Sequence, residues 1–347
     1  MAEAATKAPS NPAGPAPLRR PASIRRTTSL DTDWPEGIGK PMRMRGRARD
    51  LFTPKNGGEG RVLGDDWTEI LASPLREIMA IDAIRHAPEL QEMVGLRAGG
   101  HLRGVIARLV ADEQAQTTPM HLLLDDFSGA SLVAGWAWSR WHDDWIEKSR
   151  REALEKSGGQ QPLIRKMEGI CAGFAPGASS LNPDGTSNQT IQSATVVPPL
   201  PNPDDPQSWH PLNAQEGVGM RRARRIDVWF EGDKVGIDVG FQDSSTSPEG
   251  GRNRYAVHEY RVAAVADPET FELLSIDVDP RILPYRECPN ASPNAKLMQG
   301  VGLTGFRLDV LERLPGTMGC THLNDVLRSM ADVPQLARRL REELAKG

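Results

Sequence analysis

Apolar and polar residues alternate along four segments in the C-terminal half of the chain. These segments read RRIDVWF, KVGIDVGF, RYAVHEYRVAAV and ETFELLSIDV, and turn sequences such as EGDK and ADPE separate them. Alternation with a period of two predicts strands that bury one face, and short turns predict antiparallel neighbours. We therefore expect an antiparallel meander over these segments.

The spacing of apolar residues changes to a helical one after these strands. In SPNAKLMQG, Ser292 is a candidate N-cap and Gly300 a candidate stop. In GFRLDVLERL and HLNDVLRSMA the apolar residues recur every three or four positions, which places them on one face of a helix. Strands followed by helices indicate an α+β fold, with the helices packed on one face of the sheet.

Short motifs occur in the same order in the two halves of the chain. Asp50 is followed by Pro54 and a pair of glycines, as Asp243 is followed by Pro248 and a pair of glycines. The motifs IMAIDA and VGLRAGG correspond in the same way to LLSIDV and VGLTGF. This order predicts a degenerate internal duplication. We expect two related α+β lobes, each an antiparallel meander with helices on one face, over residues 23–150 and 221–340.

Two other segments show no periodicity. Residues 1–22 are rich in Ala and Pro, and we expect a disordered tail. Residues 156–218 are crowded with Pro, Gly, Ser and Asn, and we expect a linker or surface excursion. Removal of residues 160–210 should cost little stability. We assign no function to the tail, and the role of residues 156–218 stays open.

Composition limits the compartment and the partners. The net charge of -4 over 347 residues is too small to indicate nucleic acid as a partner. No run approaches the roughly 18 apolar residues of a membrane helix, and the N-terminus lacks the apolar core of a secretory signal. An odd number of cysteines, Cys171, Cys288 and Cys320, favours reduced thiols and a cytoplasmic location. A protein partner and a homo-oligomer both stay open.

Reactive side chains of the second lobe fall at the ends of expected elements. Cys288 comes just before a helix, and Cys320 stands with His322 at the start of another. The unpaired N–H groups and the dipole of a helix start stabilise a thiolate, which is the form that binds metal or attacks carbon. Because the first lobe has no matching cysteines, we expect it to have a scaffolding role.

The leading hypothesis is a metal site in the second lobe. Two thiolates and an imidazole suit Zn²⁺ or an iron–sulfur cluster better than Mg²⁺ or Ca²⁺. The expected ligands are His258, Cys288 and Cys320, and Asp243, Glu259 or His322 would complete or orient the site.

Two alternatives belong to other classes of function. In the first, Cys320 is a catalytic nucleophile and His322 or His258 its base, acting on an acyl or thioester substrate. In the second, the protein is a non-catalytic ligand-binding or assembly module whose cysteines are buried. The adjacent carboxylates Asp125 and Asp126 point different ways and are expected to face solvent. The sequence contains no dinucleotide fingerprint, phosphate loop, serine elbow or Cys-x-x-Cys motif that would name a substrate.

The motifs GFQDSS, VHEYRV, DPRILPYRECPNA, LMQGVGLTGFR and GCTHLNDVLRSMA resemble a bacterial family known as a domain of unknown function, DUF2889, over about residues 221–335. No established activity comes with this resemblance. The layout of strands and cysteine-led helices is also similar to scaffold proteins of the NifU type, on which iron–sulfur clusters are assembled. Those proteins use three cysteines, whereas His258 takes the place of the first one here. Similarity of layout does not determine function.

Overall fold

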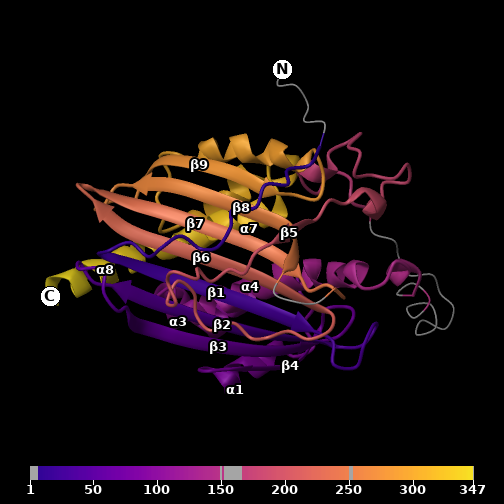
Figure 1. The fold of residues 1–347 in the computed structure, drawn as a ribbon, viewed down its shortest axis with the longest axis horizontal. Helices are drawn as coiled ribbons and strands as arrows, with labels where there is room; N and C mark the ends of the chain where they lie inside the picture. The colour runs from indigo at the N-terminus through magenta and orange to yellow at the C-terminus, as the bar shows by residue number, and fades with distance from the viewer. Residues whose placement is uncertain (1–6, 149–150, 152–165, 250–252, 347) are drawn as a thin grey trace.

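A nine-stranded antiparallel sheet crosses the computed structural model, which describes residues 7–148, 151, 166–249 and 253–346 (Figure 1). The strand order is β4-β3-β2-β1-β6-β7-β8, and both β5 and β9 pair with β8. The strands are β1 (Ser23–Asp33), β2 (Met42–Thr53), β3 (Arg61–Ala72), β4 (Ile78–Ala83), β5 (Thr195–Val197), β6 (Gly219–Glu231), β7 (Lys234–Ser245), β8 (Arg254–Ala266) and β9 (Leu273–Ile282).

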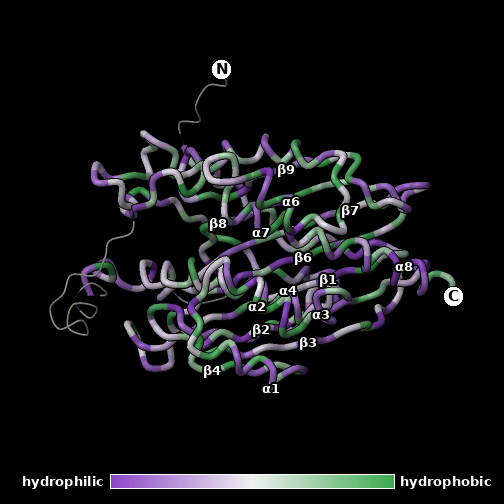
Figure 2. The backbone as a smooth tube through the Cα atoms, turned by 180° about the vertical axis from the view of Figure 1, so that it is seen from behind, coloured by the Kyte–Doolittle hydropathy of each residue, from purple (hydrophilic) through white to green (hydrophobic). Residues whose placement is uncertain are grey.

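The longer helices lie together behind the sheet, as the reverse view shows (Figure 2). Helix α4 contacts β1, β2, β3 and β6, while α8 contacts β1 and β6 and α7 contacts β8. The α-helices are α1 (Ala87–Leu90), α2 (Leu102–Leu109), α3 (Ala111–Ala115), α4 (Pro119–Ala134), α6 (Phe306–Arg313), α7 (Thr321–Ser329) and α8 (Val333–Lys346). The 3-10 helices are η1 (Gln91–Met93), η2 (Gly135–Arg140), η3 (Ala172–Phe174), η4 (Gln189–Ile191), η5 (Cys288–Met298), η6 (Gly316–Met318) and η7 (Met330–Asp332).

The expected α+β fold and the antiparallel meander from β6 to β9 are confirmed. Strands β1 to β4 form a second meander, and β1 pairs with β6 from Ser23 to Asp33, so both halves contribute to one continuous sheet. Helices α6 and α7 also follow the expected spacing. The helix expected from Ser292 is different: the chain forms the 3-10 helix η5 from Cys288, and Ser292 lies buried inside it. Prolines in this segment remove the N–H groups that an α-helix needs.

Neighbouring side chains of strand β1 point to opposite faces of the sheet. Arg26 points to the helices, where its Nη1 donates to Asp332 at 2.7 Å. Arg25 points to the other face, where its Nη1 donates to the backbone oxygens of Pro17 and Ser208. Successive side chains of a strand alternate between faces, so a polar pair such as Arg25-Arg26 ties both layers to the sheet.

Residues 7–22 and 195–218 cover the face opposite the helices, whereas a disordered tail was expected for the first of these segments. Asn11 N–H donates to Arg281 O, and Arg19 forms an ion pair with Asp205 at 3.0 Å. Trp209 is only 5% exposed. Proline-rich segments leave carbonyl groups unpaired, and the arginines of the strands bind these carbonyls. Residues 1–6, 149–150 and 156–165 of the expected tail, first lobe and linker lie outside the described residues.

His210 is buried in this covering layer. Because of it, we expect the stability of the folded protein to decrease in acid. Its ring nitrogens lie 2.9 Å from the hydroxyls of Ser29 and Thr27, and burial lowers its pKa to about 3. Burial also lowers the pKa of His121, on the helix side, to about 4. Both residues take up protons more readily when unfolded, so stability present above pH 6.5 is lost as the pH falls toward these values.

We expect the free energy of unfolding to fall by about 1 kcal/mol per pH unit for each of these histidines between pH 6.5 and 5. Urea unfolding at several pH values measures this slope. His210→Gln keeps one hydrogen bond and removes the titration, so the slope should decrease. An unchanged slope in this variant would contradict the assignment.

No helix within the described ranges combines the length and the apolar character needed to cross a bilayer.

Candidate functional site

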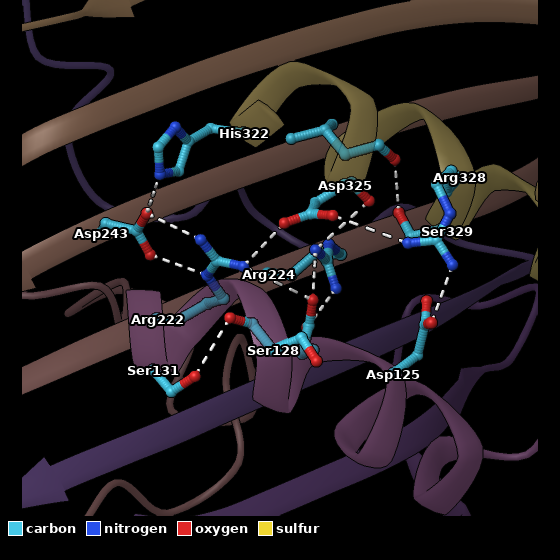
Figure 3. Close-up of polar contacts among 12 residues, drawn as sticks. Asp125, Ser128, Ser131, Arg222, Arg224, Asp243, His322, Asp325, Arg328 and Ser329 are labelled. Carbon is cyan, nitrogen blue, oxygen red and sulfur yellow. Dashed lines mark hydrogen bonds and ion pairs between the residues drawn. The ribbon is translucent and has the colours of Figure 1, made fainter. Parts of the chain in front are cut away.

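Asp243, His258 and His322 meet between the sheet and helix α7. Asp243 lies in β7 directly opposite His258 in β8, where a bulge interrupts the pairing of the two strands. His322 is the second residue of α7 and points down toward Asp243 (Figure 3). One ligand atom from each of the three side chains lies within 4.8 Å of the other two. Three separate elements therefore converge on one point.

The distances in this group are long for hydrogen bonds. Asp243 Oδ2 lies 3.3 Å from His258 Nδ1 and 3.8 Å from His322 Nε2. Both nitrogens are buried and have no hydrogen-bond partner among the described residues. In a tetrahedral site with bonds of about 2.0 to 2.1 Å, neighbouring donor atoms are separated by about 3.3 to 3.5 Å. The spacing is therefore close to that of donors around one metal ion.

Arg222 in β6 binds the carboxylate of Asp243 through two hydrogen bonds. Its Nε donates to Oδ1 at 2.9 Å and its Nη2 donates to Oδ2 at 3.0 Å. Burial favours the neutral acid, yet the guanidinium beside it holds the pKa of Asp243 well below its usual range. Asp243 is consequently an anion that is fixed in orientation.

The imidazoles of His258 and His322 are stacked face to face. Their ring centroids lie 3.5 Å apart and their planes differ by 21°. Burial lowers the pKa of both side chains, and for His322 the neighbouring His258 lowers it further. Both rings are thus held neutral, which is the form in which histidine binds a metal.

The Asp243–Arg222 pair continues into a buried network of arginines and aspartates between sheet and helices (Figure 3). Arg222 Nη1 donates to Asp325 of α7 at 2.9 Å. Asp126 of α4 accepts from Arg224, and Asp125 accepts from Arg328 at 2.7 Å. Asp125 and Asp126 were expected to face solvent, and this is wrong. Arg224 of β6 binds Asp126, and Arg328 of α7 binds Asp125. The network links both halves of the chain.

Gly129 of α4 lies directly against this network. A Cβ atom at this position would collide with Arg222 Nη1 and with Asp325 Oδ2. Glycine is therefore required here for the helix to approach the pair so closely.

Gly129→Ala is expected to lower the free energy of unfolding by about 1 to 3 kcal/mol, because either the helix or the buried ion pair has to move. Gly104→Ala in α2 is the matched control, since its Cβ would meet nothing within 4 Å. That change should be neutral or stabilise the helix by up to about 1 kcal/mol. Urea denaturation of both variants tests the difference, and equal effects would contradict the close packing at Gly129.

The cysteines do not belong to the group formed by Asp243, His258 and His322. Cys320 precedes α7 and accepts a hydrogen bond from Tyr260 Oη at 3.4 Å. Cys288 lies in the hydrophobic core beside Gly173 and Cys171. Burial raises the pKa of all three thiols, that of Cys171 to about 12. Within the described ranges, neither of the groups with metal-ligand spacing includes a cysteine.

Glu259 faces the opposite side of the sheet from its neighbour His258. Its carboxylate accepts from Gln242 Nε2 at 2.7 Å and from the backbone N–H of Ala13 at 2.5 Å. Because adjacent side chains of a strand point to opposite faces of the sheet, His258 and Glu259 lie on different faces. The structure thus brings together Asp243, His258 and His322, and it separates Glu259 from them.

A second group with metal-ligand spacing lies in the first half of the chain. It contains His86, Asp112 and Glu113. Glu113 already receives two hydrogen bonds from Arg85, at 2.6 and 3.0 Å, and Asp112 is mostly exposed. Ion pairs around the buried Glu113 account for this arrangement without a metal.

Sequence reasoning missed Arg222 and Asp325, which orient Asp243. A signal for Arg222 was present, because RRARRIDV places arginines at alternating positions of a strand that is otherwise apolar on its helix side. An arginine that points into a core requires a buried carboxylate, and Asp243 in the neighbouring strand was available.

Comparison with known proteins covers only the second half of the chain. No curated protein matches the chain, and no solved structure matches it. The matched region contains Asp243, His258 and His322 together with Arg222 and Asp325. Residues 220–335 match the model of the family described as "Protein of unknown function (DUF2889)".

Proposed function

We propose that Asp243, His258 and His322 bind one divalent transition-metal ion, Zn²⁺ or Fe²⁺. The observation that carries the proposal is the convergence of three ligand atoms within 4.8 Å, two of them buried nitrogens without a hydrogen-bond partner. A buried polar atom without a partner is unfavourable, and a bound cation would satisfy both nitrogens and the carboxylate together.

The three ligands favour a metal ion that keeps open coordination positions. Two imidazoles and one carboxylate suit iron or zinc, whereas an iron–sulfur cluster needs thiolates. Three protein ligands leave at least one position for water or a substrate, which is typical of catalytic rather than structural zinc sites. The function we propose is therefore metal-dependent chemistry at this site.

Arg222 would hold the metal ligand Asp243 in a fixed orientation. Ligating carboxylates are usually held by hydrogen bonds from a second set of residues, and Arg222 holds both oxygens of Asp243. Its own charge is balanced by Asp325 and Asp126 as well. The histidine rings would have to turn from their stacked position, because each nitrogen donates its lone pair in the plane of its ring.

The cysteine-nucleophile alternative has less support. A nucleophilic cysteine needs a lowered pKa and access to substrate. Cys320 is 4% exposed, and burial raises its pKa. The buried thiols agree better with packing roles, and free cysteines support the expected cytoplasmic location.

Isothermal titration with Zn²⁺ tests the proposal. We expect one ion per chain, and we expect His322→Ala to weaken binding by at least tenfold because one of three ligands is lost. His101→Ala, at an exposed histidine, is the matched control and should bind as the wild type does. Cys320→Ser should also bind normally. Loss of binding in Cys320→Ser, with His322→Ala unaffected, would contradict the proposed ligands.

We also infer that the two halves arose by duplication. Arg26 of β1 binds Asp50 of β2 through two hydrogen bonds, as Arg222 of β6 binds Asp243 of β7. In both halves a four-stranded meander is followed by helices on the same face of the sheet. Equivalent ion pairs at the first two strands of each half support a common origin, with the first half as scaffold.

A further inference from the structure

A cavity lies at the edge of the molecule, apart from the site of Asp243. Its volume is about 780 Å³, within the range of pockets that hold small organic ligands. Several distant segments form its wall: the start of the described chain, the end of η2, the segment before β5, the start of β8 and the residues after β9. The residues that matter for its chemistry are Lys7, Arg140, Ser179, Tyr255, Tyr285 and Arg286.

The described charged residues that line this cavity are all basic. Three basic residues, Lys7, Arg140 and Arg286, line the cavity, and none of its described lining residues is acidic. Arg286 is paired with Glu287, which lies outside the lining, at 3.0 Å. Lys7 and Arg140 have no ion-pair partner among the described residues. A concave surface with excess positive charge attracts anions.

The guanidinium of Arg140 is held in place by stacking on an aromatic ring. Its guanidinium carbon lies 4.1 Å from the centre of the Tyr255 ring, which fixes the plane of the guanidinium. Its Nε is buried and has no hydrogen-bond partner among the described residues. A guanidinium that lines a cavity, is fixed by stacking and has no ion-pair partner among the described residues is arranged to bind an anion, and its planar fork matches phosphate or carboxylate oxygens.

We propose that this cavity binds a small organic anion that carries phosphate or carboxylate groups, with Arg140 as its main anchor and Lys7 as a second cation. Hydroxyl groups of the wall would contact the remainder of the molecule, since the cavity is larger than a single phosphate. The proposal does not depend on the metal site, because no ligand of that site lines this cavity.

Isothermal titration of the full chain with ADP, inorganic phosphate and citrate, at 150 mM salt, tests this inference. We expect ADP or citrate to bind, and inorganic phosphate to bind more weakly because it fills little of the cavity. Arg140→Gln should weaken binding of the better probe by about tenfold to a hundredfold, as expected for loss of a charged hydrogen bond. Lys7→Gln, at a position where the fold is not at risk, should weaken it by a few-fold.

Arg108→Gln is the matched control, because Arg108 is exposed on α2 and paired with Glu92 away from the cavity. Preference for ADP would identify phosphate as the anionic group, and preference for citrate would identify carboxylate. Failure of all three probes to bind would overturn the inference. Equal weakening in Arg140→Gln and Arg108→Gln would also overturn it, since only general electrostatic attraction would then be at work.

Discussion

Asp243→Asn is expected to lower the free energy of unfolding by about 3 to 5 kcal/mol, measured by urea denaturation with a chelator present. The substitution keeps the shape of the side chain and removes its charge. Arg222, which is 1% exposed, would then lose the carboxylate that binds it through two hydrogen bonds. Asp325 and Asp126 would still balance its charge, but the amide NH₂ of the new Asn would face one of the buried N–H groups of Arg222, which is strongly unfavourable. The chelator removes any contribution from bound metal.

Asp279→Asn is the control for this experiment. Asp279 pairs with Arg281 at 2.8 Å, but its side chain is 45% exposed. Exposed ion pairs contribute about 0 to 1 kcal/mol, so this variant should unfold almost as the wild type does. A loss below about 1 kcal/mol in Asp243→Asn would show that the buried network does not depend on this carboxylate.

Trp209→Ala is expected to lower the free energy of unfolding by about 3 to 5 kcal/mol, the usual effect of removing a buried aromatic side chain. Trp209 packs with Ala16 and Ala223, and thereby joins both covering segments to the sheet. Removal of residues 195–218 should accordingly destabilise the protein, whereas the sequence predicts a small effect for removal of residues 160–210.

Ile191→Ala is the matched control in the same part of the chain, because Ile191 is 45% exposed. Its unfolding free energy should change by no more than about 0.5 kcal/mol. If Trp209→Ala and Ile191→Ala had the same small effect, the covering layer would contribute nothing to stability.

Local patterns predicted the strands from β6 to β9 well, because alternation reports directly on which face of a strand is buried. The covering segments could not be predicted in this way. Their contribution comes from carbonyl groups that accept from Arg25 and from a few buried side chains such as Trp209, and composition carries no information on these.

The candidate site was predicted in part. Asp243, His258 and His322 were each expected near the site, but the cysteines were expected beside them. Residues two apart on one strand face the same side and are separated by about 6.6 Å. His258 and Tyr260 of β8 are such a pair: His322 stacks on the first, and Cys320 accepts from the second. The spacing along β8 therefore separates Cys320 from His322.

Titration of the full chain with Co²⁺, followed by absorption spectroscopy, tests the proposed metal site most directly. Cobalt takes the place of zinc, and its visible bands report its geometry, while a charge-transfer band in the near ultraviolet reports thiolate ligands. With Asp243, His258 and His322 as ligands, we predict visible bands at one equivalent of Co²⁺, no thiolate band, and loss of the spectrum in His258→Ala. A strong thiolate band, or a spectrum unchanged in His258→Ala, would contradict the site described here.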